Sequence, residues 1–159
     1  MSAEIALSNG LICLVDPEDL SWASLIKWHY RASRRTGYAT YNAKVPHRRT
    51  KDMHTLILEA PPGLVVDHIN GDGLDNRRRN LRLVTVSQNG MNQKAQLRST
   101  SKYKGVSWDK ARSLWYAHVK ANGLMKNLGR FASEDDAARA YNAAAVRLFG
   151  EFARINEVP

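Results

Sequence analysis

Residues 64–84 of this chain read LVVDHINGDGLDNRRRNLRLV. An apolar run ends in the pair Asp67 and His68, a polar loop with an Asn-Gly turn and three arginines follows, and the stretch closes on the mostly apolar LRLV. Short apolar runs bounded by turn residues predict strands, so we expect two strands joined by a long loop. A Thr-x-x-Gln capping box begins at Thr85 and predicts a helix over residues 86–91.

The first 60 residues predict a strand-rich support for this stretch. Apolar runs and turn residues alternate along them, and a Pro-Pro-Gly sequence at residues 61–63 separates them from the strand–loop–strand segment. The expected elements are a strand over 11–15, a helix over 18–25, paired strands over 27–32 and 38–43, and either a strand or a short helix over 53–58.

After a polar, basic stretch at residues 93–102, which we interpret as a linker, the pattern changes. Three short strands are expected over residues 105–108, 114–120 and 124–128. A helix follows, with Ser133 as its N-cap and Gly150 as its stop signal. Strands and helices therefore occur in both parts of the chain, and the predicted fold class is α+β.

The composition is that of a soluble globular protein with 159 residues, 43% hydrophobic and 25% charged, which suits one ordinary domain or two small ones. No apolar run approaches the ~18 residues needed to cross a bilayer, and the N-terminus lacks the pattern of a signal peptide. Cys13 is the single cysteine, which excludes a disulfide framework and a cysteine-based zinc site. We expect an intracellular, soluble protein in a reducing compartment.

The charge distribution indicates a polyanionic partner. The formal net charge is +9, and from Arg77 to Arg130 there are thirteen Lys or Arg residues against one acid, Asp109. A solvated basic surface is the plain alternative. The concentration of cations in one central stretch favours nucleic acid.

The Asp67-His68 pair has the chemistry that phosphodiester hydrolysis needs, namely an activated water and neutralisation of the developing charge. Asp67 is the natural anionic ligand for a hard divalent ion, and His68, with an ordinary pKa of about 6.5, is the natural base for the water. The amide oxygen of Asn89, on the predicted helix, would complete the metal site. Neighbours on a regular strand point to opposite faces, so the strand is expected to break at the Asn-Gly turn.

These residues match a known family. Residues 53–92 resemble the HNH homing endonucleases of the ββα-metal group, through Asp-His-x-Asn-Gly, Asp-Asn-Arg, Asn-Leu-Arg and an Asn eight residues after Leu81. The resemblance implies an HNH core over 53–92 within a nuclease domain that spans residues 1–92.

The same resemblance implies a role for each site residue. His68 would be the general base, Asp67 and Asn89 the metal ligands, and Asn80 the middle Asn of the family name. Asn80 is expected to bridge the long loop by hydrogen bonds and so to hold His68 in place. Many members of the wider group carry His at the position of Asn89.

Two features of this segment have two interpretations each. His54 either packs in the interior or contacts substrate, and packing is the preferred interpretation. The run Arg77, Arg78 and Arg79 is either a solvated charge run or a phosphate contact, and its place in the loop beside the proposed site favours at least one contact to phosphate.

Residues 103–158 resemble the plant-type APETALA2/ethylene-response-factor DNA-binding domain. The matching residues include Tyr-Lys-Gly-Val at 103–106, Trp-Tyr-Ala at 115–117, Leu-Gly-Arg-Phe at 128–131 and the alanine-rich helix that follows. The resemblance implies a three-stranded antiparallel sheet in the major groove of DNA, backed by one helix. Several contact positions of the plant domain carry other residues here, so the plant target sequence is not carried over.

Alternation along the second strand of this domain predicts which side chains face DNA. Trp115, Ala117 and Val119 are expected to face the helix. The candidates for contact with bases are Lys104, Ser107, Lys110, Tyr116, His118, Lys120 and Asn127. The candidates for contact with phosphates are Lys102, Lys126 and Arg130.

We therefore expect a metal-dependent DNA endonuclease of the homing type, which nicks DNA or breaks both strands at a site found by the C-terminal sheet. The expected partners are double-stranded DNA and one divalent ion, Mg²⁺ or Mn²⁺, with no membrane and no small-molecule cofactor. We expect a monomer, phage-borne or otherwise mobile, acting in the cytoplasm of a bacterial host. The alternatives are a DNA-binding regulator that does not cut and an RNA-binding or ribosome-associated basic protein.

Overall fold

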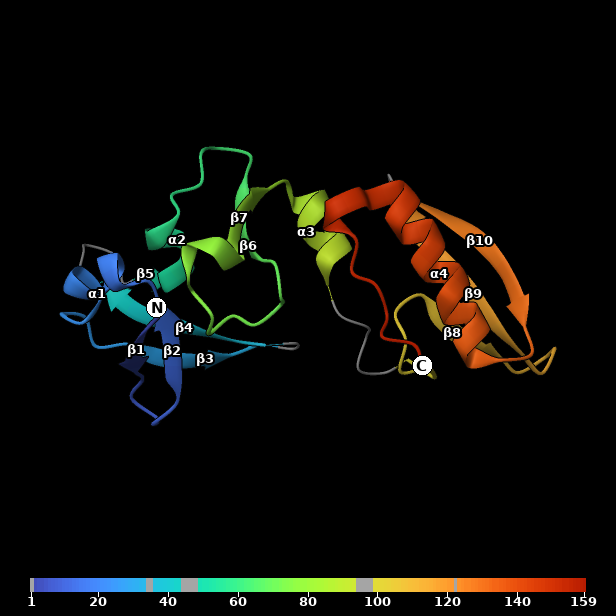
Figure 1. Cartoon of the computed structure of the whole chain (residues 1–159), viewed down its shortest axis with the longest axis horizontal. Coiled ribbons are helices and arrows are strands. Elements are labelled where there is room, and N and C mark those ends of the chain that lie inside the picture. Colours follow the sequence, from blue (N-terminus) through green and yellow to red (C-terminus); the bar gives the residue numbers. More distant parts are fainter. Residues whose placement is uncertain (1, 34–35, 44–48, 94–98, 122) are drawn as a thin grey trace. The chain divides into compact units, whose positions relative to one another are not determined.

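Short strands and helices alternate through the chain (Figure 1), and the fold class is α+β, as predicted. The computed structural model describes residues 2–33, 36–43, 49–93, 99–121 and 123–159, and it divides the chain into two units, Met1–Val86 and Ser87–Pro159. Part of the predicted linker, residues 94–98, lies outside the described residues. No helix in the described ranges is long and apolar enough to cross a membrane.

In its described residues the first unit contains three small antiparallel sheets and two short helices. Strands β1 and β2 pair, β4 lies between β3 and β5, and β6 pairs with β7. The elements in chain order are β1 (Ala3–Ala6), β2 (Ile12–Val15), α1 (Pro17–Ala23), β3 (His29–Ala32), β4 (Gly37–Ala43), β5 (Arg49–Asp52), α2 (Met53–Ile57), β6 (Val65–His68), the 3-10 turn η1 (Arg78–Asn80) and β7 (Leu81–Val84). The stretch 53–58, for which strand and helix were both open, is helical over α2.

One hydrophobic core joins the N-terminal strands to the β6–β7 pair. The buried side chains of Val15, Trp28, Met53, Val66 and Leu81 all belong to it. Burial of these apolar groups from segments far apart in the sequence is what holds the strand pair against the rest of the unit.

The long loop between β6 and β7 is fastened to the N-terminal strands by backbone groups. The backbone N–H of Leu14 on β2 donates to the carbonyl of Leu74 at 2.8 Å, and the N–H of Asn76 donates back to the carbonyl of Leu14 at 2.8 Å. The N–H of Gly73 donates to the hydroxyl of Thr36 at 2.9 Å. These bonds give the loop a fixed path although it contains little regular structure.

The second unit is one antiparallel sheet with a long helix on one face. Strand β9 lies between β8 and β10. The elements are α3 (Val86–Asn92), which begins at the last residue of the first unit, β8 (Val106–Asp109), β9 (Leu114–Ala121), β10 (Leu124–Phe131), α4 (Glu134–Phe149) and the 3-10 turn η2 (Gly150–Phe152).

Helix α4 begins and ends where its end signals predict. The hydroxyl of Ser133 accepts a hydrogen bond from the N–H of Asp136, and Gly150, with φ +54°, follows the last helical residue. The helix packs its buried alanines and Tyr141 against Ala117 and Val119 of β9. Alternation along β9 therefore places these two residues on the helix face, as predicted.

Candidate active site

The end of β6 places a buried carboxylate and a buried imidazole next to each other in the chain. Asp67 is 7% exposed and His68 is 5% exposed. In the antiparallel register Asp67 lies opposite Arg82 and His68 lies opposite Leu81. The strand ends at His68, and the turn that follows is closed by a hydrogen bond of 2.9 Å from the N–H of Gly71 to the carbonyl of His68. The predicted break in the strand falls directly after the pair.

The ring of His68 is held on one edge by an amide and on another side by two aromatic rings. Its Nε2 lies 3.3 Å from Oδ1 of Asn76, a side chain with no exposed surface. The ring centroid lies 4.8 Å from that of His54 and 5.9 Å from that of Tyr38. With the amide oxygen as acceptor, Nε2 carries the proton and Nδ1 is the basic nitrogen.

Burial lowers the pKa of His68 below its ordinary value. Desolvation is the largest cause, and the hydrogen bond with Asn76 and the nearby carboxylates Asp67, Asp72 and Asp75 oppose it. The imidazole is therefore neutral at neutral pH, which is the form that accepts a proton from water.

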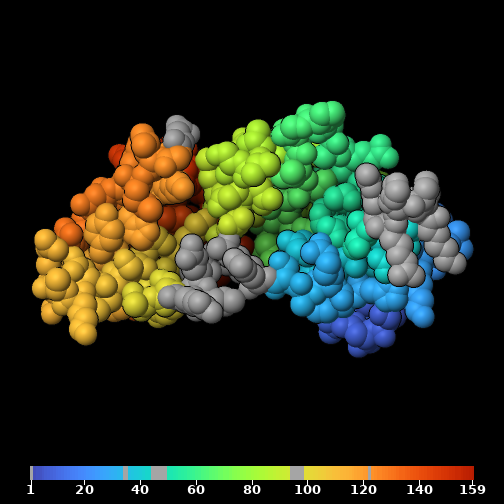
Figure 2. All heavy atoms as spheres, turned by 180° about the vertical axis from the view of Figure 1, so that it is seen from behind, coloured from blue at the N-terminus to red at the C-terminus, as the bar shows by residue number. Residues whose placement is uncertain are grey.

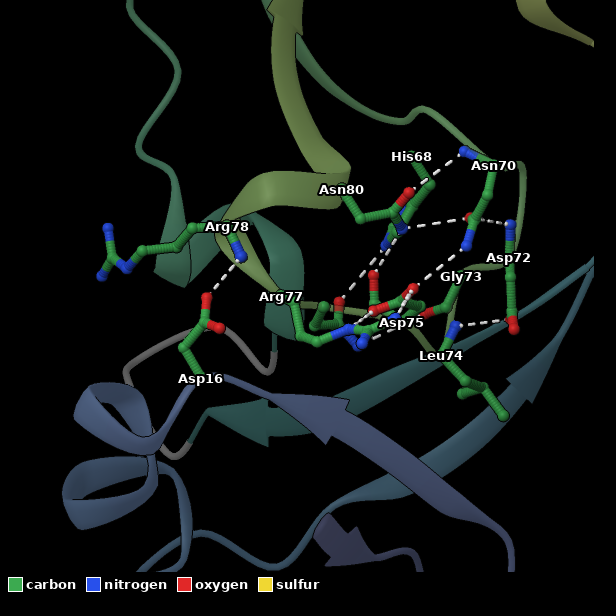
Figure 3. Close-up of polar contacts among 11 residues, drawn as sticks. Asp16, His68, Asn70, Asp72, Gly73, Leu74, Asp75, Arg77, Arg78 and Asn80 are labelled. Carbon is green, nitrogen blue, oxygen red and sulfur yellow. Dashed lines mark hydrogen bonds and ion pairs between the residues drawn. The ribbon is translucent and has the colours of Figure 1, made fainter. Parts of the chain in front are cut away.

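Asn80 ties the two ends of the loop together (Figure 3). Its Nδ2 donates to Oδ1 of Asn70 at 3.0 Å and to the backbone carbonyl of Asp75 at 2.7 Å. Its Oδ1 accepts from the backbone N–H of Asn70 at 3.1 Å. Asn80 thus bridges the loop, while the amide that touches His68 is Asn76.

Asn70 and Asn76 are both of the residue type that shapes loops by bonding nearby backbone groups. Asn70 does so, since its Oδ1 accepts from the N–H of Asp72 at 2.8 Å. Asn76 also contacts the base, and no signal in the sequence separates the two amides. Their different roles arise only when the loop is folded back onto β2.

Two of the three consecutive arginines are engaged by acids. Arg77 binds Asp75 through Nε and Nη2, both at 2.6 Å. Arg78 binds Asp19 through Nε at 2.9 Å and Nη2 at 2.8 Å, and its Nε lies 2.7 Å from Glu18. These pairs fasten the loop to itself and to α1.

Arg79 differs from its two neighbours. It is exposed, and within the described ranges it forms no ion pair. Of the three arginines proposed for phosphate, Arg79 therefore has the guanidinium that is not already engaged by a carboxylate.

His54 is buried beside His68, in line with the preferred interpretation that it packs. It is 8% exposed, and its Nδ1 has no hydrogen-bond partner in the described part of the structure. Burial, and next the neighbouring His68, lower the pKa of His54 to about 4. A neutral imidazole therefore packs edge-on, at 72°, against the proposed base.

The carboxylate of Asp67 is the anionic group predicted to bind a metal ion. Its Oδ2 accepts hydrogen bonds from Nε and Nη2 of Arg82, both at 3.0 Å. Asn89, the second predicted ligand, lies on α3 in the second unit, and its role stays a prediction. Among the described residues, no group of three or more His, Cys, Asp or Glu side chains is arranged to hold a metal ion.

The sheet of the second unit has one face covered by α4 and one face turned away from it. Figure 1 shows α4 in front of the strands, and Figure 2, from the opposite side, shows the yellow and orange strand atoms covering most of the helix. Tyr116 and His118 stack there with ring centroids 5.3 Å apart, and the guanidinium of Arg130 lies 5.2 Å from the centre of the Tyr116 ring. Nδ1 of His118 is buried with no hydrogen-bond partner in the described structure.

The other DNA-contact candidates of this unit differ in how far they are engaged. The exposed ones are Lys102, Lys110, Lys120, Lys126 and Asn127, and Ser107 is half-buried. Lys104 donates through Nζ to the carbonyl of Met91. Arg130 also binds Asp109 through Nε at 2.9 Å, and Oδ1 of Asn127 accepts from the N–H of Gly129 at 2.8 Å.

Comparison with known proteins agrees with the geometry of the first unit. The profile of the HNH endonuclease family matches residues 59–91. An uncharacterized HNH endonuclease of Acanthamoeba polyphaga mimivirus is 37% identical over 152 residues, which cover 94% of this chain and 77% of the relative. Protein 3.8 of Escherichia phage T7 is 33% identical over 111 residues, which cover 70% of this chain and 91% of the relative. No solved structure matches the chain. The chain belongs to the HNH endonuclease family.

Proposed function

We propose that this HNH endonuclease is a metal-dependent DNA endonuclease of the homing type and that Asp67 and His68 carry out the hydrolysis at the end of β6. The observation that carries the proposal is the buried, neutral imidazole of His68, held by the amide of Asn76 and preceded in the chain by the buried carboxylate of Asp67. The phage and mimivirus relatives are in keeping with a mobile, phage-borne enzyme.

His68 supplies the base. A water molecule gives its proton to Nδ1, and its oxygen attacks the phosphorus while the bond to the leaving oxygen breaks. A pKa below the ordinary value keeps the ring in its proton-accepting form at neutral pH. Asn76 fixes the tautomer and the orientation of the ring, and Asn80 fixes the loop that carries Asn76.

Asp67 and Asn89 are the residues that would hold the divalent ion, Mg²⁺ or Mn²⁺. HNH nucleases generally use such an ion, which stabilises the negative charge that develops on the phosphate during cleavage. The donor set fits, because carboxylate and amide oxygens are hard ligands.

The sheet of the second unit would locate the target. Its face away from α4 carries the stacked rings of Tyr116 and His118 with exposed cations along the strands, among them Lys120 and Arg130. Stacked rings and cations suit DNA better than they suit a protein partner with an apolar surface. Arg79 in the first unit would add a phosphate contact near the site.

Cleavage of DNA tests the proposal. The full chain is incubated with supercoiled plasmid and with the DNA that flanks its gene, in Mg²⁺, in Mn²⁺ and in EDTA. We expect cleavage in either metal, none in EDTA, and a loss of at least about 100-fold for His68→Ala, the usual scale for removing a general base. His29→Ala is the matched control, since His29 lies in the same unit and bonds Ser8. Equal cleavage by wild type and His68→Ala would refute the assignment.

A further inference from the structure

The side chains of Asp67 and Arg82 form an ion pair across the two strands of the active site. They face each other in the register of β6 and β7. Both Nε and Nη2 of the guanidinium bond one oxygen of the carboxylate, Oδ2, at 3.0 Å. The side chain of Arg82 is 14% exposed and that of Asp67 is 7% exposed, so the pair is shielded from solvent far more than a surface salt bridge.

This pair differs from the pair of Arg78 with Asp19 in what it connects. Arg78 and Asp19 are 59 residues apart in the chain, and their pair ties the loop to α1. Asp67 and Arg82 lie on strands that backbone hydrogen bonds already join at four register positions. An ion pair there joins two strands that are already held together. A buried pair also often adds little net stability, because both charges lose their water.

The carboxylate in question is the one proposed to hold the divalent ion. A guanidinium and a divalent cation compete for the same lone pairs of Oδ2, and a guanidinium held there also repels a cation on the neighbouring Oδ1. A guanidinium also presents a planar fork of donors that matches the oxygens of a phosphate.

We propose that Arg82 is a positioning residue that holds the Asp67 carboxylate in the metal-free protein, releases it when a divalent ion binds, and then offers its guanidinium to a DNA phosphate. The inference rests on the proposed function, because it takes Asp67 as a metal ligand. Without DNA, the ion can bind only while the Asp67 carboxylate is not paired with Arg82. The apparent affinity for the ion is therefore multiplied by the fraction of time that the carboxylate is unpaired. If the ion pair is broken about one tenth of the time, the apparent affinity for the ion falls about tenfold.

Mn²⁺ binding by the full chain without DNA tests the inference, measured by titration calorimetry. Four proteins are compared: wild type, Arg82→Gln, Asp67→Asn and the control Arg78→Gln, which removes an arginine–carboxylate pair of the same unit. We expect Arg82→Gln to bind Mn²⁺ about tenfold more tightly than wild type, Arg78→Gln to bind as wild type, and Asp67→Asn to lose binding. Arg82→Gln should nevertheless cleave DNA more slowly, because the phosphate contact is gone.

The outcomes separate the inference from the proposed function. If Asp67→Asn loses the ion but Arg82→Gln binds it no more tightly than wild type, the role of Arg82 is wrong and Asp67 stands as a ligand. If Asp67→Asn binds Mn²⁺ as well as wild type, both are overturned, because the ion is not on Asp67.

Arg82→Gln leaves a buried carboxylate unpaired and can therefore fail to fold, so a second variant is needed. Arg82→Lys keeps a cation but loses the two-pronged contact, so it should bind Mn²⁺ a few times more tightly than wild type. The rise in melting temperature on adding Mn²⁺ should then be larger for Arg82→Lys than for wild type. An equal or smaller rise overturns the inference.

Discussion

Replacing Asn80 should loosen the active-site loop, because its buried side chain joins two parts of that loop. The side chain is 8% exposed and makes three hydrogen bonds, two to Asn70 and one to the carbonyl of Asp75. Asn80→Ala removes all three and leaves their partners in the loop unsatisfied. A lost hydrogen bond of this kind costs about 1 kcal/mol, so we expect the free energy of unfolding of the first unit to fall by about 3 kcal/mol.

Urea unfolding followed by ¹H–¹⁵N NMR of the indole groups measures this change unit by unit. Trp22 and Trp28 report on the first unit, and the two tryptophans of the second unit provide an internal reference. For a slope of about 2 kcal/mol per molar urea, the midpoint of the first unit should fall by about 1.5 M. The control is Asn42→Ala, which removes an exposed amide bonded to Thr50 and should change the free energy by less than about 0.5 kcal/mol.

Asn80→Asp separates the donated bonds from the accepted one. The new carboxylate has nearly the same shape and still accepts from the N–H of Asn70, but it cannot donate, and it places a negative charge near Asp75. At neutral pH this variant should be at least as unstable as Asn80→Ala, and it should recover part of the difference as the new carboxyl is protonated at lower pH. The reasoning is refuted if Asn80→Ala shifts the midpoint no more than Asn42→Ala does.

Three further predictions follow from burial, close contacts and charge. The pKa of His54 is about 4, below its value in the unfolded chain. The contribution of His54 to the free energy of unfolding should therefore be fully present above about pH 6.5 and should fall by about 3 kcal/mol as the pH drops towards 4. Urea midpoints measured against pH should show this loss, and His54→Phe should reduce it. Gly73→Ala places a Cβ 2.3 Å from a carbonyl oxygen of β4 and should cost about 1–3 kcal/mol in thermal unfolding, whereas the control Gly90→Ala, where no atom lies within 4 Å, should cost nothing. Lys120→Ala should weaken DNA binding and lower the slope of log affinity against log salt by about 1, measured by fluorescence anisotropy, and an unchanged slope would remove Lys120 from the interface.

The second unit was the more predictable half of the fold because its signals are local. The alternation along residues 114–120 places Ala117 and Val119 on the helix face, and the end signals Ser133 and Gly150 bracket a helix whose alanines recur at helical spacing. In each case the deciding information lies within a few residues of the element that it specifies.

In the first unit the sequence leaves more open. Met53 to Leu58 is an apolar run that fits a strand or a helix, and the helix forms because the segment packs on the core through Met53 and Ile57. The sequence does not predict the strand Ala3–Ala6, since four residues of mixed polarity carry little periodicity. Tertiary contacts, and not local propensity, decide both segments.

The sequence predicts that Asn80 bridges the loop by hydrogen bonds, but two other contacts of the site depend on the fold. Asp67 and His68 are adjacent in the sequence, whereas the pairing of Asp67 with Arg82 depends on the strand register. The contact between His68 and Asn76 depends on the loop path, which is set by bonds to Leu14. A motif therefore gives the groups that take part in the chemistry, and the fold determines which of them touch.

The arginines of the loop show why this distinction matters for function. A run of three cations beside a nuclease motif suggests a phosphate clamp, yet Arg77 and Arg78 are neutralised by Asp75 and by the acids of α1. These pairs fix the loop that carries Asn76, the amide in contact with His68, and a role of Arg77 and Arg78 in binding phosphate stays a prediction. We therefore propose that the long-range attraction comes chiefly from the second unit, where cations outnumber acids along the sheet. A charge count along the sequence does not show which cations are already paired, because the pairing of Arg78 depends on how the loop lies against α1.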